Sequence, residues 1–179
     1  AIPIHCRCNA ALLRDGISEG DTLLQISHGG RKFTSVDHPE RWNQIAQVWN
    51  ALFDKLPFSE PLILVEADLI WTPETMLHLL NDLTFEEVDA VAPQSLQGGR
   101  FYDTWGHRWS PEHCFSSSPL PLDGELQKIY SAGSCIVMQP WVYRDCRYGE
   151  NDGMVGFGRD INMHGYNLWV DPTQSVTHP

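Results

Sequence analysis

Two acidic residues separated by one position, Glu66 and Asp68, directly follow an apolar run of strand length at residues 61–65. Alternate residues of an extended segment point to the same side, so both carboxylates can face one ion. Ligands of open α/β sheets bind beyond the carboxyl ends of the strands. Mg²⁺ and Mn²⁺ take carboxylate oxygens and keep substrate phosphates as further ligands, which suits neutralisation of a diphosphate leaving group. The alternative is a pair of solvated acids that end a strand and precede a helix.

The motifs of several other nucleotide-using classes are absent from the sequence. There is no G-x-x-x-x-G-K-[ST] phosphate loop, no G-x-G-x-x-G after a strand and no G-x-S-x-G. These absences count against P-loop, dinucleotide-binding and α/β-hydrolase chemistry. A carboxylate-held metal on an α/β sheet is the remaining common choice.

The elements around the acidic pair alternate between helix and strand. Apolar residues at spacings of three and four predict a helix from Pro39 to Leu56, and Thr72 followed by Pro73 predicts the start of another. The continuous apolar run at 61–65 favours a central, mainly parallel strand covered on both faces. We therefore expect a single α/β domain with a mainly parallel sheet and flanking helices. Further strands are expected at 1–7, 21–27, 33–36, 88–92, 134–139 and 167–170, and short helices at 9–16 and 159–164.

Several segments taken together resemble one enzyme family. Residues 62–71 resemble the D-x-D segment of glycosyltransferases with the GT-A fold, with Glu66 in place of the first Asp. The tail from 156 through 172 to His178 is similar to the end of that catalytic domain, above all in fungal Golgi α-mannosyltransferases of the mannan-polymerase type. Residues 100–105, Arg-Phe-Tyr-Asp-Thr-Trp, are similar to their Arg-Tyr-Asp stretch and to the Tyr-Asp of capsular α-mannosyltransferases. The likeness covers roughly residues 20–179, and it implies a GT-A-like, Rossmann-like single domain over residues 1–179.

The resemblance implies a metal-dependent glycosyltransferase that moves a sugar from a nucleoside-diphosphate sugar to an acceptor hydroxyl. The tail segment weakly favours mannose as that sugar. In the family, the D-x-D segment holds Mn²⁺ or Mg²⁺ on the diphosphate of a GDP- or UDP-sugar, and a late His often completes the coordination. Carried over, Asp68 and His178 are the expected metal ligands, and Glu66 contacts the ribose or reaches the ion through water.

The same resemblance suggests residues for the sugar side of the site. Asp160 is the expected catalytic carboxylate, a general base in an inverting enzyme or a stabiliser of positive charge in a retaining one. Glu150 and Asp152 are rivals for that role, and Asp152 is also a candidate for substrate binding. The remaining expectations are Tyr102, Asp103 and Trp105 for the sugar ring, and Arg100 and Arg108 for phosphate.

Composition limits the other partners. With 12 Lys+Arg against 23 Asp+Glu the net charge is −11, which argues against nucleic-acid binding. No apolar run reaches the length of a membrane span, which predicts a soluble segment, cytoplasmic or Golgi-lumenal depending on its flanks. The chain lacks an initiating Met, and we expect a segment trimmed at its N-terminus. Five irregularly spaced Cys do not indicate a disulfide scaffold, and Cys6 with Cys8 is weak evidence for zinc.

Residues 94–122, rich in Gly, Ser and Pro, are expected to form a long irregular loop on the acceptor side. Two other functions stay open at this point. One is a carbohydrate-binding module without turnover, and the other is a metal-dependent nucleotidyl or phosphoryl transferase.

Overall fold

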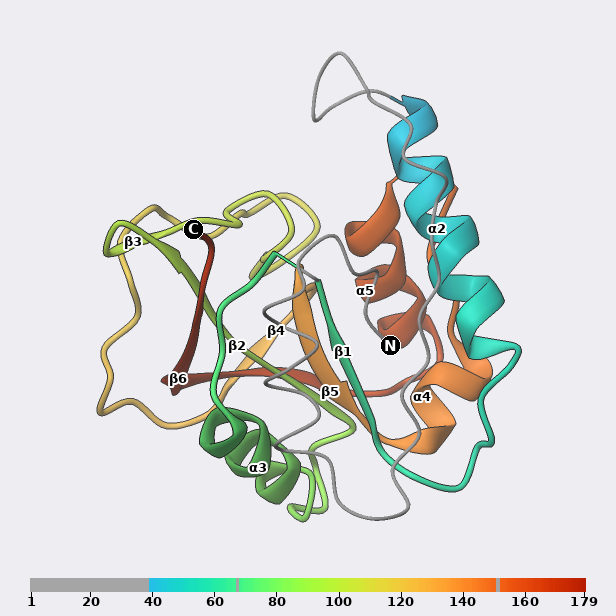
Figure 1. The fold of residues 1–179 in the computed structure, drawn as a ribbon, viewed down its shortest axis with the longest axis horizontal. Coiled ribbons are helices and arrows are strands. Elements are labelled where there is room, and N and C mark those ends of the chain that lie inside the picture. Colours follow the sequence, from blue (N-terminus) through green and yellow to red (C-terminus); the bar gives the residue numbers. More distant parts are fainter. Residues whose placement is uncertain (1–38, 67, 151) are drawn as a thin grey trace.

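The computed structural model describes residues 39–66, 68–150 and 152–179 (Figure 1). The strands and the helix expected within residues 1–38, and the Cys6–Cys8 pair, lie outside the described residues. In chain order the elements are α2 (Pro39–Phe53), β1 (Leu62–Val65), α3 (Pro73–Asp82), β2 (Ala90–Gln97), β3 (Arg100–Phe101), β4 (Gln127–Ile129), β5 (Cys135–Met138), α4 (Pro140–Asp145), α5 (Gly153–Met163) and β6 (Leu168–Thr177).

The two helices predicted from apolar spacing are present. In α2 the side chains of Trp42, Trp49 and Phe53 are buried, as their spacing on one helix face requires. In α3 the hydroxyl of Thr72 accepts a hydrogen bond from the backbone N–H of Thr75 at 3.3 Å, and Pro73 is the first helical residue. Both features of the predicted helix start are thus confirmed.

The α/β class with flanking helices is also confirmed, but the expectation of a mainly parallel sheet is wrong. The strand order is β1-β5-β2-β6-β4, with β3 paired to β2. The pair β2–β6 is parallel, and β1–β5, β2–β5, β2–β3 and β4–β6 are antiparallel. A continuous apolar strand indicates cover on both faces, and this cover is present. The expectation of a central strand is wrong, because β1 is the end strand of the sheet in the described residues and pairs only with β5 there. Strand direction depends instead on the chain connections, which the apolar run does not encode.

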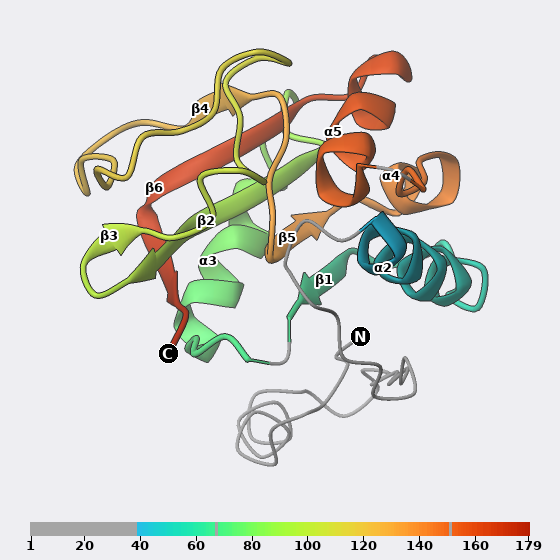
Figure 2. The ribbon, with the colours of Figure 1, turned by 90° about the horizontal axis from the view of Figure 1, so that it is seen from above.

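Helices cover both faces of the sheet (Figures 1 and 2). Alternate strand residues divide between two cores: Leu62 and Leu64 of β1 pack with α2 and α5, whereas Val65 packs with α3. Burial of each large apolar side chain stabilises the fold by roughly 1.5–3 kcal/mol. The sheet is therefore held rigidly between two helical layers, and its ends can carry a site.

The boundaries of several elements differ from those expected, and α2 ends at Phe53 rather than at Leu56. β2 and β6 continue through Pro93 and Pro172, because the register between them shifts between Pro93 and Gln94 and the irregularity accommodates a residue without an N–H. α5 begins at Gly153, whereas the sequence predicts a start at residue 159. The predicted start is too late because the glycines of this segment lower its apparent helix propensity. A Cβ on Gly158 would collide with the backbone of Tyr130 and Ser131, so this glycine allows the helix to pack closely.

The long loop predicted at 94–122 starts later than expected, because β2 extends to Gln97 and β3 follows at Arg100–Phe101. The loop has its own aromatic packing, in which Phe115 stacks on Trp109 with ring centres 4.0 Å apart and contacts the buried His107. Gln94 tethers the loop: its side-chain amide donates to the carbonyl of Pro172 at 2.6 Å, and its carbonyl oxygen accepts from the N–H of Leu120 at 2.6 Å. Within the described ranges, none of the helices has the length and apolarity needed to cross a membrane.

Candidate metal and substrate site

The chain that leaves β1 meets the end of β6 (Figure 2). The N–H of Glu66 donates to the carbonyl of Ser134 at 2.9 Å, which continues the β1–β5 pairing by one residue. Ile70 and Thr177 then exchange two backbone hydrogen bonds of 2.8 Å each. This pairing places Asp68, just before Ile70, beside the residue that follows Thr177.

That residue is His178, and its Nε2 lies 3.2 Å from Oδ2 of Asp68. The imidazole stacks on the ring of Tyr102, with centres 4.1 Å apart and planes at 22°. The backbone N–H of His178 donates to the carbonyl of Leu96 at 2.8 Å, and its Nδ1 lies 3.2 Å from the carbonyl of Pro179. Nδ1 also lies 3.4 Å from the side-chain amide nitrogen of Gln97. If Nδ1 accepts from that amide, Nε2–H donates to Asp68, whereas an Nδ1–H donated to Pro179 leaves the Nε2 lone pair facing the Asp68 carboxylate. Two such acceptors need a proton or a cation between them.

Three carboxylates gather here, and we call the set Glu66, Asp68, Tyr102, Asp103 and His178 the acidic corner. Loss of hydration at Glu66, together with the charges of Asp68 and Asp103, raises the pKa of Glu66 to about 7. The pKa of Tyr102 is also raised, first by partial burial and then by the same acids. The negative charges of Asp68 and Asp103 therefore act directly on Glu66 and Tyr102.

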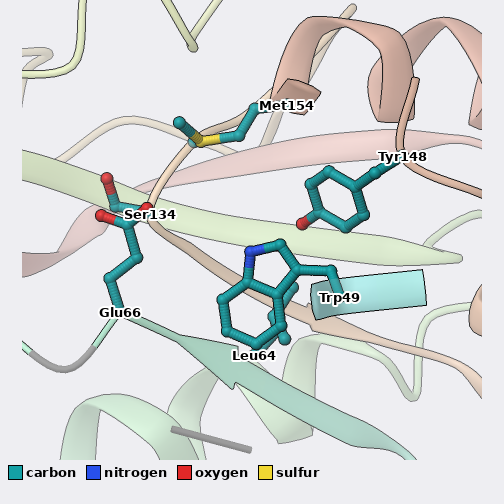
Figure 3. A pocket seen from close by; sticks show the side chains of 7 residues that line it. Trp49, Leu64, Glu66, Ser134, Tyr148 and Met154 are labelled. Carbon is teal, nitrogen blue, oxygen red and sulfur yellow. The ribbon is translucent and has the colours of Figure 1, made fainter. Parts of the chain in front are cut away.

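Glu66 borders a small cavity of about 10 Å³, enough for about one water molecule (Figure 3). Glu66 and Ser134 lie on one side of the cavity, and Trp49 and Tyr148 on the other. The Tyr148 ring is buried and stacks nearly parallel on Phe157, with centres 4.4 Å apart. This apolar wall removes water from the neighbourhood of Glu66 and explains the loss of hydration.

Asp103 is fixed in place by short polar contacts. Its Oδ1 accepts from the N–H of Gly106 at 2.9 Å, and its Oδ2 accepts from the hydroxyl of Ser134 at 3.3 Å. A Cβ at Gly133 or at Gly106 would collide with the Asp103 carboxylate. The two glycines therefore leave the space in which this side chain is held, and such a held carboxylate can position a polar ligand.

A stacked aromatic pair lies on the α2 side of the same region. Trp42 and Trp105 stack with ring centres 4.5 Å apart and planes at 23°. The guanidinium of Arg41 lies 4.8 Å from the Trp42 ring centre, and that of Arg108 lies 5.6 Å from the Trp105 ring centre. The charge of Arg41 also acts on Glu66 and lowers its pKa, though by less than the acids raise it. Arg41 thus brings positive charge to the edge of the acidic corner.

Asp160, Asp152 and Arg100, which were also predicted for the site, have other surroundings. Asp160 is on α5, where its Oδ2 accepts from the backbone N–H of Arg147 at 2.7 Å and its Oδ1 lies 3.7 Å from Nδ1 of His164. Asp152 pairs with Arg159 at 2.5 Å, and Arg100 is exposed in β3. Among the described residues, the charged groups that shift the pKa of Glu66 are Asp68, Asp103 and Arg41. The structure therefore brings Glu66, Asp68, Tyr102, Asp103 and His178 together, and it places Asp160 and Asp152 with other partners.

Sequence reasoning missed two contributors to the site. Ser134, which follows Gly133 and directly precedes β5, donates a hydrogen bond to Asp103. The available signal in the sequence was a pair of small residues just before a predicted strand. Arg41 near the start of α2 carries no sequence signal beyond its charge. Among the described residues, three potential metal ligands come together in two places, Cys146–Asp160–His164 and His78–Asp82–Asp171, whereas the acidic corner offers the Asp68–His178 pair.

No protein-family model matches the chain, and a search of curated proteins finds no match.

Proposed function

We propose that this chain is a metal-dependent glycosyltransferase that moves a sugar from a nucleoside-diphosphate sugar to an acceptor hydroxyl. The observation that carries the proposal is the 3.2 Å approach of Asp68 Oδ2 to His178 Nε2, between residues 110 positions apart. The sequence resemblance implies the same two side chains as metal ligands.

The residues present fit a divalent cation. Asp68 offers an exposed carboxylate, and His178 offers an Nε2 lone pair whose orientation is fixed by the Pro179 carbonyl and the Tyr102 ring. Carboxylate and imidazole together suit Mn²⁺ better than they suit Ca²⁺. When bound, such an ion would neutralise the negative charge that develops on the departing diphosphate.

The other residues of the corner would bind and orient the sugar. The fixed carboxylate of Asp103 can accept hydrogen bonds from sugar hydroxyls, and the exposed face of Tyr102 offers an apolar surface. Glu66, beside Asp68, can accept a hydroxyl proton or a hydrogen bond from the ribose. Arg41, whose charge acts on Glu66, would supply positive charge for phosphate oxygens, whereas the Arg108 guanidinium donates to the carbonyls of Trp105 and Pro111.

The acceptor base remains a prediction with two candidates. Asp160 comes from the resemblance, but its carboxylate is engaged by the N–H of Arg147. Glu66 comes from the geometry, since it lies within the acidic corner. Turnover of Asp160→Asn and Glu66→Gln separates them: the variant of the true base loses turnover far more than donor affinity.

The proposal is tested by donor hydrolysis and transfer with UDP- and GDP-sugars, with and without Mn²⁺. We expect Mn²⁺-dependent release of the nucleoside diphosphate, and a loss of at least about 100-fold in Asp68→Ala and in His178→Ala. Asp123→Ala, which removes an exposed loop acid, is the matched control and should keep full activity. Circular dichroism must show all three variants folded.

Two outcomes would replace the proposal. Nucleotide-sugar or sugar binding without any turnover in the wild-type protein would indicate a carbohydrate-binding module. Consumption of nucleoside triphosphates in place of nucleotide sugars would indicate a nucleotidyl or phosphoryl transferase.

A further inference from the structure

A second group of potential ligands lies between helix α3 and strand β6, apart from the acidic corner. His78 and Asp82 are one turn apart on α3, so both project from the same helix face. Their partner is Asp171 of β6, whose Oδ2 is 3.4 Å from Nε2 of His78. Oδ1 of Asp82 lies 3.9 Å from the same nitrogen, and the three ligand atoms all lie within 4.8 Å of one another.

The two acids of this group are buried, and each has an oxygen without a hydrogen-bond partner. Asp82 is 4% exposed and Asp171 is 3% exposed. Oδ2 of Asp82 and Oδ2 of Asp171 accept no hydrogen bond, although buried carboxylate oxygens are normally paired. Two neighbouring carboxylates kept from water in this way require a positive charge or a shared proton between them.

The orientation of Asp171 is fixed from the outside. Its Oδ1 accepts both the backbone N–H of Thr173 at 2.8 Å and the hydroxyl of Thr173 at 2.7 Å. These bonds leave Oδ2 directed to the cluster, which is the arrangement that supporting hydrogen bonds give to metal-binding carboxylates. His78, with about half of its side chain exposed, provides a path from solvent to the buried acids.

We propose that His78, Asp82 and Asp171 form a zinc site. One imidazole and two carboxylates are a ligand set that Zn²⁺ accepts, with water in the remaining position. Ligand atoms at about 2.0–2.2 Å from a tetrahedral zinc ion lie about 3.3–3.6 Å apart, close to the separations of His78 Nε2 from the two acids. Mg²⁺ and Ca²⁺ prefer sites built from oxygen alone, so the imidazole argues against them.

The ion has a structural consequence. It joins α3, which begins five residues after Asp68, to β6, which ends one residue before His178. Zinc would therefore fasten together the two elements that hold the acidic corner, and binding should stabilise the folded chain.

The test is calorimetric titration of the full chain with zinc chloride, performed in the His178→Ala background so that the acidic corner contributes no imidazole. We expect one bound zinc ion and a rise of about 5–10 °C in the melting temperature at a hundredfold excess over the dissociation constant. Adding His78→Ala should weaken binding at least about 10-fold and remove that rise. Because the His78 side chain is half-exposed, we expect His78→Ala to fold. Asp171→Asn is a second variant, which should also weaken zinc binding.

His113→Ala, which removes an exposed loop histidine, is the matched control and should bind zinc as tightly as its parent. Equal zinc affinity with and without His78 would overturn the proposal. Loss of zinc binding in His164→Ala alone would also overturn it, because the ion would then be bound by Cys146, Asp160 and His164. The absence of zinc binding would mean that Asp82 and Asp171 share a proton. Because no nucleotide sugar is used, failure of the glycosyltransferase proposal leaves this result unaffected.

Discussion

Replacement of Glu66 by Gln should change how the stability of the protein depends on pH. Loss of hydration and the neighbouring acids raise the pKa of Glu66 from 4.5 to about 7 in the folded chain. The folded state thus favours the protonated form. The stability that this gives is fully present below pH 4.5 and is lost as the pH rises through about 7.

The magnitude follows from the difference between the two pKa values. A difference from 4.5 to about 7 corresponds to about 3 kcal/mol. Asp68 is exposed, and solvent screens its part of the effect, so we expect about 1–3 kcal/mol. Glu66→Gln is neutral at every pH and has no such dependence.

The assay is urea unfolding of both proteins between pH 4.5 and 8.5, with a chelator present. The free energy of unfolding of the wild type, relative to that of Glu66→Gln, should fall by about 1–3 kcal/mol across this range. Asp123→Asn changes the charge of an exposed loop residue and controls for the change in net charge. Parallel curves for the wild type and Glu66→Gln would show that Glu66 is hydrated in the folded protein, and would refute the account of the acidic corner given above.

Three further predictions concern packing around the site. Leu79→Ala, at a fully buried position of α3, should lower the free energy of unfolding by about 2–5 kcal/mol. Leu77→Ala, at a position 65% exposed on the same helix, should change it by less than about 0.5 kcal/mol. Equal effects of the two substitutions in urea unfolding would contradict the placement of α3. Gly133→Ala should cost about 1–3 kcal/mol by displacing the Asp103 carboxylate, and a crystal structure with that carboxylate unmoved would disprove the reason given. Tyr102→Ala should raise the Mn²⁺ concentration needed for half-maximal activity about 10-fold by freeing the stacked imidazole, while Tyr102→Phe should not; similar changes in both would assign the effect to the hydroxyl.

Local signals in the sequence identified most elements but not how the strands pair. The stripe of α2 and the Thr72–Pro73 start of α3 depend on neighbouring residues, and both were predicted. The pairing of β1 with β5 joins Leu62 to Met138, and nothing local to either residue encodes that partner. The run at 61–65 indicated burial on both faces correctly and strand direction incorrectly.

The site was predictable to the extent that the resemblance placed its residues. Asp68 and His178 were chosen by likeness and lie together, whereas Asp160, chosen the same way, lies on α5 with Arg147 as a partner. The His78–Asp82–Asp171 group had no signal, because its members come from a helix and a strand that meet only in the folded chain. Tertiary proximity of this kind cannot be read from spacing.

The side chain of Gln94 gives the long loop a second point of attachment to the sheet. The side chain of Gln94 in β2 is hydrogen-bonded to both Leu120 and Pro172. The loop is therefore attached to the sheet at Leu120 as well as where it leaves β3. Inside the loop, the carbonyl of Ser117 also accepts from the N–H of Phe101 at 3.0 Å, and the buried Phe115 contacts His107, so these positions help to hold Tyr102 and Asp103. Substitutions at its exposed positions Glu112 and His113 should therefore leave the backbone around Tyr102 and Asp103 in place.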